Sequence, residues 1–202
     1  MNKTFQTLAW VLFAAVVIGA LIYGFSQNSN NQAEATVSQS EPQKVEILKY
    51  SDYQCPACKI YIPLQEQLKR DFGDNLTIEY RHFPLSGHQF AELAARSTEA
   101  ARNQGHFKEM HDMIFEGQET WSQGNARSIF FEYAEEIGLD MDRFEEDIDS
   151  EEVRNIVQRQ KAEGQRRMVN ATPTFFINGQ RLRQNPQSYE QFKSIVEMYM
   201  YR

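Results

Sequence analysis

The chain contains two cysteines, Cys55 and Cys58, which are separated by Pro56 and Ala57. They follow a run of strand-forming residues and begin a segment with a helical pattern, so they should share one face of a helix, close enough for a disulfide. The free N–H groups and the positive dipole end of that helix favour a thiolate at Cys55. We expect Cys55 to be exposed and to react first, and Cys58 to resolve the mixed disulfide.

Three other roles for this pair have to be weighed against redox chemistry. A disulfide across two intervening residues restrains little chain entropy, so a purely structural bridge is disfavoured. A zinc site needs four ligands, and the four histidines of the chain are scattered. Two unrelated buried thiols are disfavoured by the position between a strand and a helix. We therefore expect a redox-active Cys55–Cys58 disulfide that requires no metal, nucleotide or flavin cofactor.

The elements around the pair indicate an α/β core that is split by a helical block. Strand patterns cover 45–50, 76–83, 174–177 and 180–183, and helical patterns cover 56–72, about five helices within 88–169, and 188–201. Gly73 should end the first helix, Asn178-Gly179 should form a type I′ hairpin turn, and Ser188 should cap the last helix. The predicted order is β-α-β, a helical insertion, a β-hairpin and a final helix.

Four segments together resemble the DsbA-like branch of the thioredoxin superfamily, close to its membrane-anchored bacterial forms. They are SDYQCPAC at 51–58, YRHFPLSGH at 80–88, FKEMHDMIF at 107–115 and ATPTFFING at 171–179, and the resemblance covers about 44–200. It implies a thioredoxin-like α/β fold with a helical subdomain between its two halves. It also implies a cis Pro173, with the backbone of Thr172 pairing with an extended substrate opposite Pro56 and Ala57.

Two positions depart from the pattern of this family. Its strongest oxidants have a histidine where this chain has Ala57, so one source of thiolate stabilisation is missing. Relatives often have an acidic residue where this chain has Lys49. If Lys49 points at the cysteines, its charge would stabilise the Cys55 thiolate, and burial could make it a proton shuttle. The alternative is that Lys49 points into solvent from an edge of the strand.

The N-terminal part indicates a membrane segment followed by a linker. Residues 8–25 carry no charge over about 18 positions, which approaches the length of a membrane-spanning helix. Lys3 precedes this segment and Lys44 is the next basic residue, so the positive-inside rule exports everything that follows. We predict an anchor or signal segment over 1–25, a polar linker over 26–43 and the thioredoxin domain over 44–202. A cleaved signal peptide is the alternative to an uncleaved anchor.

The expected function is an extracytoplasmic thiol:disulfide oxidoreductase that introduces disulfides into exported proteins. The net charge of −7 disfavours nucleic acid as a partner. The resemblance implies unfolded or reduced exported proteins as substrates and a membrane quinone-linked enzyme of the DsbB or VKOR type as reoxidant. The alternatives are a membrane-tethered reductase or isomerase, and a tethered chaperone or binding protein without redox activity. The chain shows no oligomerisation signal, and a monomer is expected.

Overall fold

The computed structural model of the chain describes residues 17, 18, 20, 23 and 41–202. Among these residues no helix is long and apolar enough to cross a membrane. Val17, Ile18, Ala20 and Tyr23 are helical. The predicted anchor over 1–25 and the linker over 26–43 lie mostly outside the described residues, so both stay predictions. The account that follows concerns residues 41–202.

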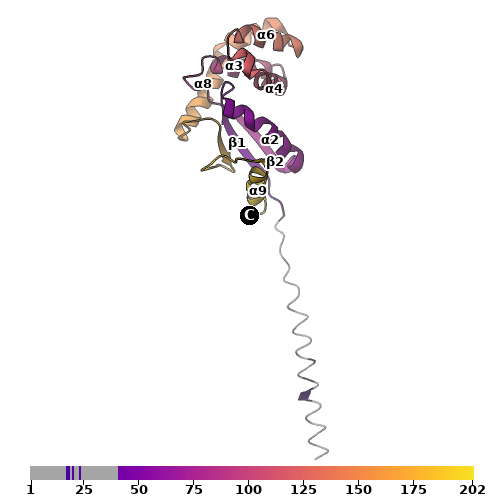
Figure 1. The fold of residues 1–202 in the computed structure, drawn as a ribbon. Helices are drawn as coiled ribbons and strands as arrows, with labels where there is room; N and C mark the ends of the chain where they lie inside the picture. Colours follow the sequence, from indigo (N-terminus) through magenta and orange to yellow (C-terminus); the bar gives the residue numbers. More distant parts are fainter. Residues whose placement is uncertain (1–16, 19, 21–22, 24–40) are drawn as a thin grey trace, which may run out of the picture. The chain divides into compact units, whose positions relative to one another are not determined.

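This part of the chain forms one sheet and a set of helices (Figure 1). In chain order the elements are β1 (Val45–Ser51), α2 (Pro56–Phe72), the 3-10 helix η1 (Gly73–Asn75), β2 (Leu76–His82), α3 (Ala91–Arg102), α4 (Phe107–Glu116), α5 (Gln118–Trp121), α6 (Ala126–Glu136), α7 (Met141–Asp149), α8 (Glu151–Arg166), β3 (Thr174–Ile177), β4 (Gln180–Arg181) and α9 (Tyr189–Met200). The order β-α-β, helical insertion, β-hairpin and helix is the predicted α/β architecture, and it is confirmed.

The sheet has the strand order β2-β1-β3-β4, with β1 in an interior position. β2 runs parallel to β1, whereas β3 is antiparallel to β1 and β4 is antiparallel to β3. Consecutive side chains of a strand point to opposite faces of the sheet. In β1, Val45 and Ile47 therefore share a face with Lys49, whereas Leu48 and Tyr50 face the other side.

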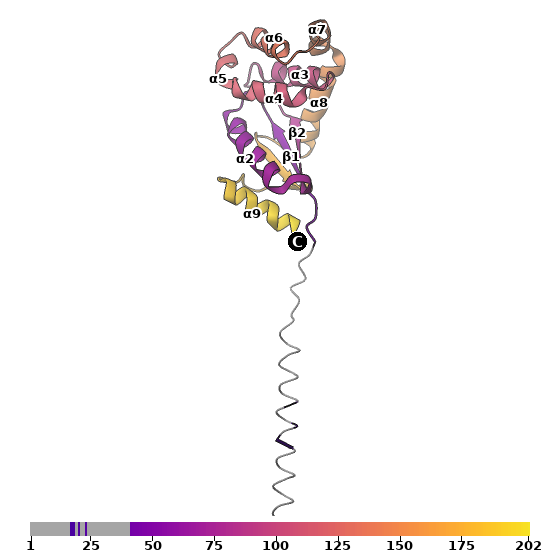
Figure 2. The ribbon, with the colours of Figure 1, turned by 90° about the vertical axis from the view of Figure 1, so that its right-hand side faces the viewer.

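Helices cover both faces of this sheet. α2 and α9 pack on the face that carries Val45 and Ile47 (Figure 2), where Leu68 and Phe192 belong to the same buried cluster. α8 lies close to the opposite face of the sheet. A Cβ atom at Gly164 in α8 would lie only 2.7 Å from the ring of Phe83, the residue after β2. A strand covered on both faces buries nearly every side chain, and this decides the environment of Lys49.

The helical insertion has its own core at the end of the sheet where β1 leads into α2. Trp121, Phe130 and Phe144 are fully buried in it. The same cluster contains Cys55 and Cys58, so the cysteines lie where the insertion meets the α/β core. The helical insertion and the α/β core thus both pack against the short loop that carries the cysteines.

Several local predictions are confirmed and a few bounds differ. α2 has the predicted limits, and Gly73 follows it with φ of 51°. Asn178 and Gly179 both have positive φ, as the type I′ turn requires, and the Ser188 side chain accepts a hydrogen bond from Gln191 N. The insertion contains six helices instead of about five, because the four-residue α5 is separate from α4. β4 is two residues long, so the predicted strand over 180–183 was too long.

Candidate active site

The loop after β1 places the cysteines at the start of α2. Cys55 is the N-cap residue, with φ −81° and ψ 116°, and Pro56 occupies the first turn, where a missing N–H costs no helical bond. The main-chain oxygen of Cys55 accepts hydrogen bonds from Cys58 N at 3.0 Å and Lys59 N at 3.4 Å. Pro56 and Ala57 are exposed on the outer side of this turn.

The two thiols have different surroundings. Cys58 is fully buried, and Cys55 is 7% exposed, so the expectation of a well-exposed Cys55 is wrong. Cys55 is covered by the loop before β3, where its thiol donates to the Thr172 main-chain oxygen at 3.4 Å. A hydrogen bond from Cys58 is the main cause that lowers the pKa of Cys55 to about 5, whereas burial raises the pKa of Cys58. The two thiols therefore differ in acidity, with Cys55 the more acidic of the pair.

The loop opposite the cysteines contains Thr172 and Pro173, joined by a cis peptide bond, as the resemblance implied. Asn185 holds this loop from the other side by donating to the main-chain oxygen of Pro173 at 2.8 Å. Thr174 donates from its hydroxyl to the main-chain oxygen of Ala171 at 2.7 Å. The backbone next to Cys55 is thus fixed by two side chains.

Lys49 lies beneath Cys58 and points away from solvent. It is fully buried, and its ammonium donates to the Cys58 main-chain oxygen and to Gln65 Oε1, both at 3.1 Å. The rings of Tyr80 and Phe115 lie 5.7 Å and 5.3 Å from the Lys49 nitrogen. Burial lowers the pKa of Lys49 to about 8. Of the two orientations left open by the sequence, the structure has the one that faces the cysteines.

Asp52 fixes the loop that precedes the cysteines. Its buried carboxylate accepts hydrogen bonds from Gln54 N at 2.7 Å and Leu85 N at 2.8 Å, and it lies 2.8 Å from His88 Nδ1. The main-chain N–H of Asp52 is directed at the Cys58 sulfur, at 3.5 Å. The SDYQ sequence before Cys55 therefore has a positioning role that was not identified from the sequence.

Gln118 holds the same loop from the helical insertion. Its side-chain amide donates to the main-chain oxygens of Tyr53 at 2.6 Å and Cys55 at 3.1 Å, and the residue is only 4% exposed. No sequence pattern indicated this contact, because Gln118 is 63 residues away from Cys55 in the chain. The insertion thus contributes a direct polar contact to the turn that carries the cysteines.

The FKEMHDMIF segment contributes packing to the site. His111 Nδ1 and the Tyr53 hydroxyl are 2.7 Å apart, and the His111 ring packs 4.4 Å from that of Tyr80. Burial is the first cause of the lowered pKa of His111. His111 is therefore a neutral buried residue that supports the loop through Tyr53.

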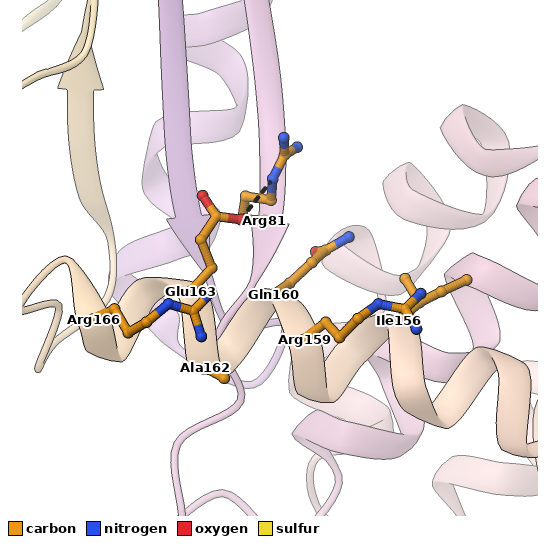
Figure 3. A pocket seen from close by; sticks show the side chains of 7 residues that line it. All are labelled: Arg81, Ile156, Arg159, Gln160, Ala162, Glu163 and Arg166. Carbon is orange, nitrogen blue, oxygen red and sulfur yellow. Dashed lines mark ion pairs between the residues drawn. The ribbon is translucent and has the colours of Figure 1, made fainter.

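The molecule also has a pocket that is not lined by the cysteines. The pocket in Figure 3, about 520 Å³ in volume, lies beside β2 and α8 and is lined by Arg81, Ile156, Arg159, Gln160, Ala162, Glu163 and Arg166. Glu163 pairs with Arg81 there, at 3.6 Å. This pocket contains no nucleophile. Within the described part of the chain, no cluster of three or more histidine, cysteine or acidic side chains could hold a metal ion.

Comparison with known proteins agrees with this geometry. A family model described as "Thioredoxin" matches residues 36–198. A thioredoxin-like oxidoreductase from Silicibacter pomeroyi DSS-3 superimposes with a TM-score of 0.65 at 25% identity, over 84% of this chain and 94% of that one. Oxidised BdbD from Bacillus subtilis superimposes with a TM-score of 0.68 at 22% identity, over 76% and 86%. The latter likeness concerns the fold alone.

The curated relatives are much longer proteins. The Na(+)/H(+) antiporter NhaA of Herminiimonas arsenicoxydans is 37% identical over 143 residues, which are 71% of this chain and 22% of the antiporter. NhaA 1 of Salinispora arenicola is 36% identical over 139 residues, 68% of this chain and 20% of the antiporter. The chain thus spans about a fifth of the length of these relatives.

Proposed function

Since the chain belongs to the thioredoxin family and its fold is similar to that of solved DsbA structures, we propose that it oxidises cysteine pairs in other proteins. The reaction is thiol–disulfide exchange at Cys55 and Cys58. The observation that carries this proposal is the asymmetry of the two thiols, with the pKa of Cys55 lowered to about 5 and that of Cys58 raised. A stabilised Cys55 thiolate favours the reduced enzyme, so the disulfide form is a ready electron acceptor.

The reaction proceeds in two exchange steps. A substrate thiolate attacks Cys55 in the enzyme disulfide, a substrate–Cys55 disulfide forms, and Cys58 leaves as a thiolate that takes up a proton. The second substrate thiolate then attacks the substrate sulfur of this mixed disulfide. The substrate disulfide forms and Cys55 leaves as its stable thiolate, so two electrons have passed from substrate to enzyme.

Lys49 serves the leaving group in the first of these steps. Its buried ammonium lies 3.1 Å from the Cys58 main-chain oxygen, on the inner side of the pair. A positive charge there favours the thiolate forms of both cysteines. With a pKa of about 8, the ammonium can also supply the proton that Cys58 takes up.

The substrate chain is held beside Cys55 by backbone and by exposed apolar surface. The Thr172 main-chain oxygen already contacts the Cys55 thiol at 3.4 Å, so a chain bonded to Cys55 must pass the Thr172–Pro173 loop. Pro56 and Ala57 are exposed on the other side of the sulfur. These four residues form the substrate surface in this proposal.

We place the domain outside the cytoplasm, attached to the membrane by the N-terminal segment. The uncharged stretch over 8–25, preceded by Lys3, supports this location, and disulfides form and persist in such compartments. Its substrates are unfolded or reduced exported proteins. A membrane quinone-linked enzyme of the DsbB or VKOR type returns Cys55 and Cys58 to the disulfide.

A reductase is the second candidate, and Ala57 is the observation that favours it. Ala57 lies between the cysteines and has no side chain that could hydrogen-bond or charge-stabilise the Cys55 thiolate. A less stable thiolate lowers the reduction potential and makes the enzyme an electron donor. The balance between Ala57 and Lys49 therefore decides the direction of the reaction.

The deciding measurement is the equilibrium reduction potential of the full chain in glutathione buffers, read by thiol trapping. A value near about −120 mV establishes a disulfide donor, and a value near about −270 mV establishes a reductase. If Cys55 and Cys58 form no reversible disulfide, redox activity is excluded. Retention of chaperone activity in a Cys55→Ser/Cys58→Ser double variant would then support a tethered binding protein.

A further inference from the structure

The pocket in Figure 3 contains two positive charges that have no partner among the described residues. Arg81 and Glu163 in its lining pair with each other, and the Glu163 carboxylate also accepts a hydrogen bond from the Tyr50 hydroxyl at 2.7 Å. Arg159 and Arg166 of α8, by contrast, form no ion pair or hydrogen bond with any described residue. We call this pocket the α8 pocket.

The two unpaired arginines make the α8 pocket a site for anionic groups. A guanidinium group has five N–H donors and binds a carboxylate through two of them. Acidic side chains outnumber basic ones in the chain by 28 to 21, and the net charge is −7. This charge repels surfaces of dense negative charge, such as an anionic membrane or a nucleic acid. The pocket therefore suits a ligand that carries a few separate anionic groups.

The spacing of the two arginines indicates two such groups. Arg159 and Arg166 are seven residues apart in α8, which is a rise of about 10.5 Å along the helix. Figure 3 shows both side chains extending along α8 in the same direction, so they do not converge on one point. In a polyproline II segment every third side chain lies on the same face, with a rise of about 9.3 Å. A polypeptide with two acidic residues three positions apart therefore reaches both arginines.

The rest of the lining suits a polypeptide. Ile156 and Ala162 contribute apolar surface on which proline rings can pack. The side-chain oxygen of Gln160 accepts a hydrogen bond from His82 N at 2.7 Å, whereas its NH₂ group donates to no described residue. That NH₂ group is available to a main-chain oxygen of a bound segment.

We propose that the α8 pocket binds a polyproline II segment of another protein in which two acidic residues lie three positions apart. Arg159 and Arg166 each bind one carboxylate, and Gln160 donates to the main chain of the segment. Neither Cys55 nor Cys58 lines the pocket, so this binding needs no thiol chemistry and does not depend on the proposed function.

The test measures binding of labelled peptides to the purified full chain by fluorescence anisotropy at low ionic strength, where exposed charges are weakly screened. The probe peptide has the core Asp-Pro-Pro-Asp. The comparison peptides have the cores Asn-Pro-Pro-Asn, without charge, and Pro-Asp-Asp-Pro, with adjacent charges. We expect the probe to bind more tightly than both, and at least about 10 times more tightly than the uncharged peptide.

Two results with the parent protein overturn the proposal. One is equal affinity for the probe and either comparison peptide. The other is binding to phosphatidylglycerol vesicles without binding to the probe, which would assign the pocket to a lipid headgroup.

Variants locate the binding on the protein. Arg159→Gln/Arg166→Gln should bind the probe at least about 10 times more weakly. Lys161→Gln/Arg183→Gln is the matched control, since it also removes two positive charges and neither residue lines the pocket, and it should bind like the parent. Equal losses in the two variants would mean that the attraction is non-specific and would overturn the proposal.

A charge reversal separates lost binding from lost folding. Arg159→Glu/Arg166→Glu should prefer a Lys-Pro-Pro-Lys peptide over the probe, because the charges of pocket and ligand are exchanged at the same spacing. A misfolded protein would not gain this preference. A variant that still prefers the probe excludes the two arginines as its binding site.

Discussion

The ammonium of Lys49 donates to the main-chain oxygen of Cys58 over 3.1 Å, in a fully buried position. Its other acceptor is the neutral Gln65, and within residues 41–202 no carboxylate forms an ion pair with it. The groups that raise its pKa, against the effect of burial, are the cysteines themselves. The charge of Lys49 therefore has a counter-charge nearby when Cys55 is a thiolate in the reduced form, and it has none when the cysteines form a disulfide.

This asymmetry predicts that Lys49→Met makes the protein a weaker oxidant. Removing the ammonium destabilises the reduced form relative to the disulfide form, because a buried thiolate loses its counter-charge. We expect the reduction potential to fall by roughly 30 to 60 mV, where 30 mV corresponds to about 1.4 kcal/mol. The measurement is equilibration with glutathione followed by thiol trapping.

Lys44→Met is the control for this prediction. Lys44 is exposed just before β1, at the end of the strand away from the cysteines, and its removal changes the net charge equally. Its potential should match that of the parent. Equal potentials for the parent and Lys49→Met would mean that the ammonium does not act on the thiolates.

The low pKa of Cys55 predicts a pH dependence that belongs to the reduced protein alone. An unfolded cysteine has a pKa of about 8.5, and folding lowers that of Cys55 to about 5, mainly through the Cys58 hydrogen bond. At pH values between these two pKa values, folding therefore releases a proton from Cys55. The resulting stability is present above the unfolded pKa and is lost as the pH falls through about 5.

Urea unfolding of the reduced and oxidised forms at pH 5 and pH 7 tests this linkage. Relative to the oxidised form, the reduced form should lose on the order of 2 kcal/mol between pH 7 and pH 5. His111 titrates in both forms, so its contribution cancels in the comparison. A second measurement is a pH titration of the thiolate absorbance of the reduced protein. In Cys58→Ala the midpoint of this titration should move toward the usual pKa of a cysteine. Parallel pH profiles for the two redox forms would contradict the lowered pKa.

The elements and the position of the cysteine pair could be predicted because their signals are local. Each of these signals acts over a few residues, and each is confirmed. They are Pro56 after Cys55, the helix end at Gly73, the Asn178-Gly179 turn and the Ser188 cap. The environment of Lys49 is not local. Leu48 and Tyr50 on one face of β1 and Ile47 on the other are all apolar. Alternation alone therefore could not tell whether the face that carries Lys49 is covered by a helix or exposed to solvent. The interior position of β1 decides it.

The covering of Cys55 depends on contacts that are distant in the chain. Thr172, whose oxygen accepts from the Cys55 thiol, is 117 residues away, and Gln118 is 63 residues away. A glutamine in a four-residue helix carries no pattern that would indicate such a role. Only the packing of the insertion against the α/β core brings these groups together, which is why the sequence suggested a more exposed Cys55.

Gln118 provides a prediction about the link between the insertion and the catalytic turn. Gln118→Leu removes the side-chain amide that donates a hydrogen bond to the buried main-chain oxygen of Tyr53. We expect the free energy of unfolding to fall by about 1–3 kcal/mol. Gln123→Leu, which removes an exposed amide nearby, is the control and should change stability by less than about 0.5 kcal/mol. Equal stabilities of the two variants would show that the Gln118 contacts contribute nothing.

Gly164 tests how closely α8 must approach the sheet. A Cβ atom at this position would lie 2.7 Å from the Phe83 ring and 2.9 Å from that of Tyr50, and both rings are packed in a buried cluster. Gly164→Ala should therefore lower the free energy of unfolding by about 1–3 kcal/mol, although alanine is the better helix former. Gln165→Ala, at the exposed neighbouring position, should leave stability unchanged or slightly raised. Urea denaturation measures both, and a Gly164→Ala variant as stable as the parent would mean that α8 can move away from the sheet at no cost.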